Sequence, residues 1–98
     1  MAATPLPDLI LYTRPACGLC DEARDIVLAL LAQRAVSGQP VPELVERDIE
    51  SDPAWKRAYF SAIPVVELGR RRLDLATSAP KLRRLLAEVL DTPPTPAS

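Results

Sequence analysis

The chain has 98 residues, which suffices for one domain with a single hydrophobic core. Hydrophobic residues make up 48% and charged residues 26%, the ordinary proportions of a globular protein. The net charge of −1 excludes a strong overall attraction to nucleic acid or to an anionic membrane. Because no apolar run approaches the roughly 18 residues of a membrane helix and no signal-peptide pattern is present, we expect a cytoplasmic protein.

The first half of the chain predicts a strand, a helix and a second strand. Leu9–Thr13 has the length and composition of a short buried strand, and Pro15 prevents that strand from continuing. Over Cys17–Ala35, apolar residues recur at three- and four-residue steps, which predicts a helix that Ser37–Pro40 ends. The next segment, Val41–Ile49, predicts a second strand around Leu44–Asp48. We expect it to run parallel to the first strand, because a helix separates the two.

The second half predicts another helix, a β-hairpin and a last helix. Ser51–Pro53 has a capping side chain followed by proline, the pattern of a helix start, and Ile63-Pro64 ends that helix. Val65–Leu68 and Arg71–Leu75 predict two strands joined by a tight turn. The last helix has its apolar side chains on a single face, namely Leu82, Leu85, Leu86, Val89 and Leu90.

These elements predict a single α/β domain over residues 1–98. Their order is β-α-β-α-β-β-α, which gives a four-stranded mixed sheet flanked by helices. We expect the core to span about 8–90, with a loose lead-in over 1–7 and a flexible proline-rich tail over 91–98.

Cys17 and Cys20 are the only two cysteines, and they stand where the first strand turns into the first helix. A C-x-x-C at such a junction in a small chain is typical of thioredoxin-like redox motifs. Two cysteines three positions apart on a helical turn can bring their Cα atoms within the roughly 4.4–6.8 Å that a disulfide needs. The helix N-terminus stabilises a Cys17 thiolate, and Arg14 supplies a further cation. This arrangement favours Cys17 as an exposed nucleophile and Cys20 as a more buried resolving thiol.

Other interpretations of the two cysteines stay open. They can be unreactive core thiols, because cysteine is among the most buried residue types. Zinc needs four nitrogen or sulfur ligands, whereas this chain has two cysteines and no histidine. Only a dimer or an external thiol could complete a zinc or iron–sulfur site, so we expect no metal site within one chain. The missing histidine also excludes Cys/His and Ser/His nucleophilic schemes.

Two segments, together with the order of the elements, indicate a family. Tyr12–Cys20 has a basic residue three positions before the first of the paired cysteines. Ile63–Val66 places a proline after the second helix and at the start of the third strand. With these features, the chain over roughly residues 8–90 resembles a small glutaredoxin-like protein of the thioredoxin superfamily, whose opening segment and cis-proline segment they match.

The resemblance implies a thiol–disulfide oxidoreductase with a thioredoxin-like fold. It implies that the Ile63–Pro64 bond is cis and that the backbone of Ile63 lies beside Cys17, where it pairs with an extended thiol substrate. The partners are then protein or small-molecule thiols and disulfides. No cofactor is bound, and glutathione is a candidate co-substrate. The Gly-Gly pair and the following acidic residues that help the family hold glutathione have no counterpart in Leu73–Ser78.

A second hypothesis is a non-catalytic thioredoxin-fold module that binds a partner or senses redox state or metal. We expect a monomer.

The charges are unevenly spread, since residues 1–55 carry four Lys/Arg and nine Asp/Glu while residues 56–98 carry eight Lys/Arg and four Asp/Glu. The cations of the second half could dock an acidic partner or a phosphate backbone, but without interleaved aromatics a charged hairpin edge that deters strand pairing is the better explanation. They are Arg70, Arg71, Arg72, Lys81, Arg83 and Arg84.

Overall fold

A computed structural model describes residues 5–91 of the chain. The expected lead-in over 1–7 and the expected tail over 91–98 therefore fall largely outside the described residues. The elements in chain order are β1 (Leu9–Thr13), α1 (Gly18–Val36), β2 (Leu44–Asp48), a 3-10 turn η1 (Ile49–Ser51), α2 (Pro53–Tyr59), β3 (Val65–Leu68), β4 (Arg71–Leu73), α3 (Ala79–Leu86) and a π-helical turn η2 (Ala87–Asp91).

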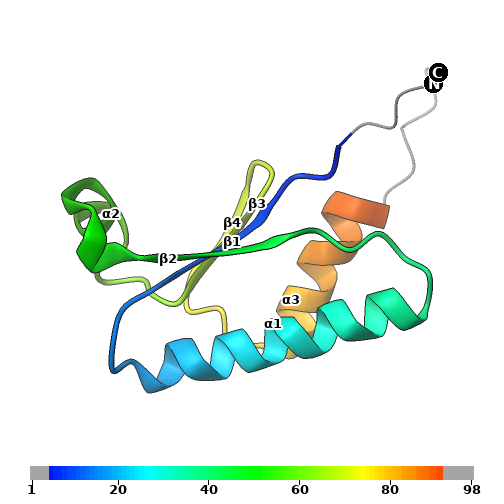
Figure 1. The fold of residues 1–98 in the computed structure, drawn as a ribbon, viewed down its shortest axis with the longest axis horizontal. Helices are drawn as coiled ribbons and strands as arrows, with labels where there is room; N and C mark the ends of the chain where they lie inside the picture. Colours follow the sequence, from blue (N-terminus) through cyan, green and yellow to red (C-terminus); the bar gives the residue numbers. More distant parts are fainter. Residues whose placement is uncertain (1–4, 92–98) are drawn as a thin grey trace.

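The four strands form one mixed sheet in the order β2-β1-β3-β4. β1 pairs with β2 in parallel and with β3 in antiparallel, so that Leu9 lies between Leu44 on one side and Leu68 on the other. Among residues 5–91, β4 pairs with β3 alone and forms one edge of the sheet. Figure 1 shows α1 and α3 together on one side of the sheet, with α2 toward the end at which α1 begins. The predicted α/β class and element order are confirmed.

The main core lies between the sheet and the two helices α1 and α3. β1 is an inner strand of the sheet, and its side chains Leu9 and Leu11 are at most 1% exposed because α1 and α3 residues pack over them. The predicted apolar face of α1 packs against them through Ala23 and Val27. The central strand and the first helix are thereby fixed relative to each other, which positions the segment that joins them.

A second apolar cluster lies around Cys20, the second cysteine. Its buried members come from four places in the chain and include Tyr12, Ile49, Ile63 and Val65. Partly buried side chains pack against this group, among them Cys17 and two aromatic residues of α2. The cysteines are therefore built into an apolar region that is separate from the main core.

The fourth strand is shorter than predicted, and the predicted last helix consists of an α-helical and a π-helical part. β4 ends at Leu73 rather than Leu75, because Leu75 adopts a left-handed φ of 47° and donates its N–H to the Ala62 carbonyl at 2.9 Å. α3 ends at Leu86, and the predicted apolar face continues through the π-helical turn η2. Within residues 5–91, no helix is long and apolar enough to cross a membrane.

Candidate active site

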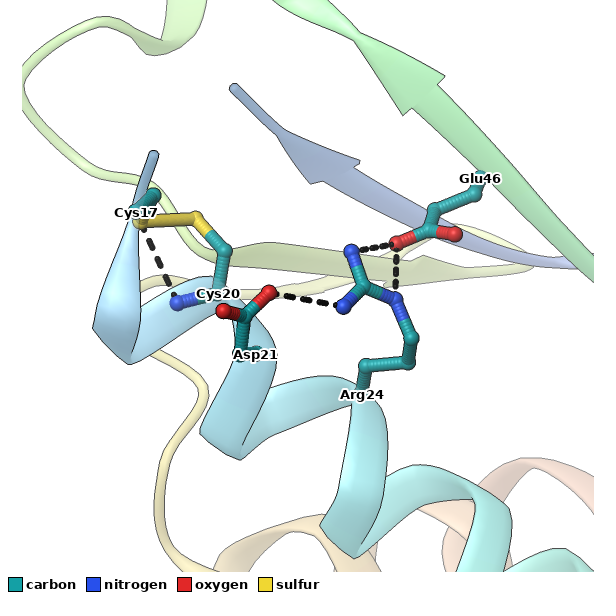
Figure 2. The surroundings of a disulfide bond; sticks show 5 residues. All are labelled: Cys17, Cys20, Asp21, Arg24 and Glu46. Atoms are coloured by element: carbon teal, nitrogen blue, oxygen red, sulfur yellow. Dashed lines mark hydrogen bonds and ion pairs between the residues drawn. A yellow bond between two sulfur atoms is a disulfide. The ribbon is translucent and has the colours of Figure 1, made fainter. Parts of the chain in front are cut away.

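Cys17 and Cys20 are joined by a disulfide at the start of α1 (Figure 2). Their Cα atoms lie 5.2 Å apart, within the range expected for a bridged pair. Cys17 is the N-cap residue of α1 with extended backbone angles, and Cys20 lies in the first turn. The disulfide therefore closes across one helical turn, where the spacing of the two residues alone brings them together.

The Cys17 sulfur performs the capping role that a serine or aspartate oxygen usually has. Its Sγ accepts a hydrogen bond from the backbone N–H of Cys20 at 3.1 Å. The Cys17 carbonyl accepts the N–H of Asp21, also at 3.1 Å, and this bond begins the helical ladder. After reduction, a negative charge on the Cys17 sulfur would meet the same N–H group and the positive end of the helix dipole.

The two sulfur-bearing side chains differ in burial. Cys20 is 0% exposed, whereas Cys17 is only partly buried at the edge of the second cluster. An incoming thiol or disulfide can therefore reach Cys17 and cannot reach Cys20 directly. This is the difference in access that an attacking thiol and a resolving thiol require.

Three charged residues, Asp21, Arg24 and Glu46, form two ion pairs next to the start of α1. The Arg24 guanidinium is 2.8 Å from the Asp21 carboxylate and 2.5 Å from that of Glu46 on β2. Figure 2 shows Asp21 and Glu46 on opposite sides of Arg24. The hydrogen bonds to Glu46 and then to Asp21 raise the pKa of Arg24. The carboxylate that directly follows Cys20 in the sequence is thus paired with a cation.

Arg14 lies on the exposed loop between β1 and α1. It lines a cleft of about 320 Å³ together with Thr13, Pro15, Arg24 and two acidic residues of β2, Glu46 and Asp48. Among residues 5–91, no side chain forms an ion pair with Arg14. Its positive charge is therefore not neutralised by a carboxylate. Arg14 lines the same cleft as Arg24.

The Ile63–Pro64 peptide bond is cis, the isomer that the resemblance implies. The carbonyls of Ala62 and Pro64 accept the N–H groups of Leu75 and Ala76 at 2.9 and 2.8 Å. Pro64 itself is fully buried. The segment is thus anchored on both sides of Ile63, in the same apolar cluster as Cys20.

The Ile63 backbone has a more restricted binding capacity than the resemblance implies. Its N–H donates to the Tyr59 carbonyl at 3.1 Å, so this donor is already used at the end of α2. Within the described residues, no hydrogen bond uses the Ile63 carbonyl. A substrate backbone would pair with that carbonyl, or would have to replace Tyr59 to reach the N–H.

Three aromatic residues in and around the second cluster, Tyr12, Trp55 and Tyr59, were not predicted as part of the site. Tyr12 stacks on Tyr59 with ring centroids 3.9 Å apart, and Trp55 meets the Tyr12 ring edge-on. The Tyr12 hydroxyl accepts from Arg47 at 3.0 Å, and the Tyr59 hydroxyl donates to Glu67 at 2.6 Å. Burial, followed by the hydrogen bond to Glu67, raises the pKa of Tyr59. The spacing of Trp55 and Tyr59 predicts that they share one face of α2, but it does not predict that this face contacts Tyr12.

Comparison with known proteins places this geometry in a family. Residues 8–89 match the family described as the glutaredoxin-like domain (DUF836). The chain belongs to this family. The matched residues include both cysteines and Ile63–Pro64. Among curated proteins, no match was found.

Two solved structures are similar to this member of the family. The X-ray structure of Northeast Structural Genomics target protein XcR50 from X. campestris is 32% identical, with a TM-score of 0.65, and the match covers 82% of this chain and 96% of that one. A single-residue mutant of thioredoxin from Halobacterium salinarum NRC-1 is 15% identical, with a TM-score of 0.63, over 92% of this chain and 80% of that one. The second likeness supports the fold alone, and the predicted thioredoxin-like fold is confirmed.

Proposed function

We propose that this glutaredoxin-like protein is a thiol–disulfide oxidoreductase that cycles between the Cys17–Cys20 disulfide and the dithiol. The observation that carries the proposal is the disulfide itself, closed between a helix-capping, accessible sulfur and a fully buried one. A purely structural disulfide needs neither the helix N-terminus nor the difference in burial. An exchange site needs both.

In the reducing direction, the Cys17 thiolate attacks one sulfur of a substrate disulfide. A mixed disulfide forms, and the other substrate sulfur leaves as a thiolate that takes up a proton. The Cys20 thiol then loses its proton and attacks the Cys17 sulfur, which releases the second substrate thiolate and forms the Cys17–Cys20 disulfide. The substrate gains two electrons from the two protein sulfurs. Of its two protons, one comes from the Cys20 thiol, and solvent returns the other, which Cys17 released when it ionised.

Three features support Cys17 as the attacking thiol. The Cys20 N–H and the helix N-terminus stabilise its thiolate. Arg14 adds an exposed cation on the preceding loop. Arg24 pairs with the Asp21 carboxylate, which reduces the repulsion that this nearby negative charge would exert on the thiolate.

The Ile63–Pro64 segment supplies the binding platform in this proposal. Its free acceptor is the Ile63 carbonyl, so a substrate would donate a backbone N–H there. The substrates are protein or small-molecule disulfides in a cytoplasmic setting, and the protein acts as a monomer without a bound cofactor. Its oxidised form returns to the dithiol at the expense of two thiols, for which glutathione is a candidate, or of a dithiol reductase.

The proposal is tested by trapping the mixed disulfide. Cys20→Ser keeps the attacking thiol and removes the resolving one, so reaction with a chromogenic aromatic disulfide should stop at a stable adduct on Cys17, detected by mass spectrometry. The wild-type dithiol should consume one disulfide and end as the internal disulfide. Cys17→Ser is the matched control and should form no rapid adduct on Cys20. Equal adduct rates on Cys17 and Cys20, or no adduct on either, would favour a non-catalytic binding or sensing module.

A further inference from the structure

A groove between β4 and α3 collects cations from two parts of the chain. It has a volume of about 300 Å³ and is lined by Arg71, Arg72, Leu73, Lys81, Arg84 and Leu85. None of these residues belongs to the cysteine site or to the Ile63–Pro64 segment. In the sequence, the cations form two separate runs, and the fold brings part of each run to the same surface.

Neighbouring carboxylates balance only two of the four cations that line the groove. Arg71 pairs with Glu88 at 2.9 Å, and Arg72 pairs with Asp74 at 2.6 Å. Within residues 5–91, the side chains of Lys81 and Arg84 have no ion-pair partner. The groove therefore has two exposed, unneutralised positive charges, and they lie one helical turn apart on α3.

Only some of the α3 cations line the groove, and Arg83 is one that does not. Arg83 lies between the two groove residues in sequence, yet it lines a different cavity, beside Leu30 and Gln33 of α1. Lys81 and Arg84 share one side of α3, and Arg83 lies on another, because consecutive helical residues are rotated by about 100°. The α3 cations are thus divided between two surfaces. A substitution of Arg83 therefore changes the net charge as a substitution of Lys81 or Arg84 does, but outside the groove.

The groove also has an apolar floor and an open strand edge. Leu85 is 6% exposed, and Leu73 is half-buried beside it. β4 lies at the edge of the sheet, and in the described part of the chain no strand pairs with its outer side. An extended peptide can use such an edge for backbone hydrogen bonds and place alternate side chains in the groove.

We propose that the β4–α3 groove is a docking surface for an acidic polypeptide segment that carries apolar residues between its carboxylates. The carboxylates pair with Lys81 and Arg84, the apolar side chains contact Leu73 and Leu85, and the backbone lies along β4. A phosphate backbone would meet the same cations, but it has no use for the apolar floor or for the strand edge. The proposal does not depend on the redox function, because the groove shares no residue with the cysteine site.

The test uses a fluorescein-labelled peptide of about ten residues, in which Glu and Thr alternate around two central leucines. Binding to the full chain is followed by fluorescence anisotropy at low salt. K81E/R84E should raise the Kd by about tenfold, since two attractive charge pairs become repulsive. R57E/R83E makes the same change in net charge outside the groove and should leave the Kd within about twofold. Salt at about 1 M should weaken wild-type binding.

The site is mapped independently on the wild-type protein, so that the test does not depend on a variant that folds. In a titration with the unlabelled peptide, amide resonances of residues 71–73 and 81–85 should shift most. Equal loss of binding in the two double variants, or shifts spread over other surfaces, would overturn the proposal. Binding of a thymidine oligonucleotide in place of the peptide would assign the groove to a phosphate backbone. Self-association abolished by K81E/R84E, without peptide binding, would assign it to a second copy of the chain.

Discussion

Arg24 donates a hydrogen bond at 2.8 Å to Asp21, the residue that directly follows Cys20 of the disulfide. The same guanidinium reaches across to Glu46 on β2. A carboxylate placed directly after Cys20 would by itself oppose formation of a thiolate at the helix start. Its pairing with Arg24 offsets the Asp21 charge, while the acidic first helical turn still suits the helix dipole.

Replacing Arg24 should therefore raise the pKa of the Cys17 thiol. In R24Q, Asp21 and Glu46 lose their common cation, and we expect the Cys17 pKa to rise by about half a pH unit to one pH unit. The pKa is measured from the pH dependence of Cys17 alkylation in the reduced protein. The double variant R24Q/D21N removes the carboxylate as well and should restore most of the original value. A Cys17 pKa that falls or stays unchanged in R24Q would contradict this role for Arg24.

Arg14 should have a smaller effect on the same thiol, and salt should remove it. R14Q should raise the Cys17 pKa by about a few tenths of a pH unit at low ionic strength, because the cation is exposed and solvent screens its charge. At about 1 M salt the wild-type and R14Q values should coincide. R83Q, which removes an exposed cation from a different cavity, beside Leu30 and Gln33 of α1, serves as the matched control. A large effect of R14Q that persists at high salt would instead indicate direct contact with the sulfur.

Tyr59 should make stability depend on alkaline pH. Its ordinary pKa of 10.0 is raised in the folded protein, by burial and by its hydrogen bond to Glu67. Above about pH 10 the unfolded chain loses this proton while the folded protein keeps it, so the free energy of unfolding must fall as pH rises. Y59F should cost about 1 kcal/mol at neutral pH, for the lost hydrogen bond, and should show a weaker fall between pH 9 and about 11. Identical pH profiles in urea unfolding would refute this assignment.

The ion pair that ties η2 to α1 should matter more for stability than an exposed pair. Arg34 is 6% exposed, donates to the Pro40 carbonyl at 2.7 Å and holds both carboxylate oxygens of Asp91. D91A leaves this guanidinium without its anion and should lower the free energy of unfolding by about 2 kcal/mol. D74A removes the exposed partner of Arg72 and should cost less than about 0.5 kcal/mol. An equal decrease in the free energy of unfolding in D91A and D74A would show that the burial of Arg34 does not strengthen its ion pair.

Much of the fold could be predicted because its signals are local. The buried run Leu9–Thr13 and the apolar face of α1 need only neighbouring residues to be recognised. The end of β4 could not be predicted, because Leu75 leaves the strand to donate a hydrogen bond to Ala62, and its left-handed φ has no local signal for a leucine. The positive φ of Ala16, just before Cys17, is a second backbone feature of this kind.

The candidate site likewise has features that the sequence predicts locally and features that depend on tertiary packing. The closeness of Cys17 and Cys20 follows from their spacing on one helical turn, so the pair could be found in the sequence. The link between Arg24 and Glu46 joins residues 22 positions apart and depends on how α1 packs against β2. The use of the Ile63 N–H by Tyr59, and the gathering of β4 and α3 cations into one groove, also depend on tertiary packing. No periodic pattern contains this information.

The central claim is that the Cys17–Cys20 pair is a reversible exchange site, and its equilibrium with a thiol buffer tests this most directly. The fraction of disulfide is measured by mass-resolved alkylation after incubation in glutathione buffers of graded composition. The account predicts a transition at a potential within the range of about −270 to −120 mV that exchange proteins span. A pair that stays oxidised at every accessible ratio, with a potential below about −300 mV, would be a structural staple and would contradict the account.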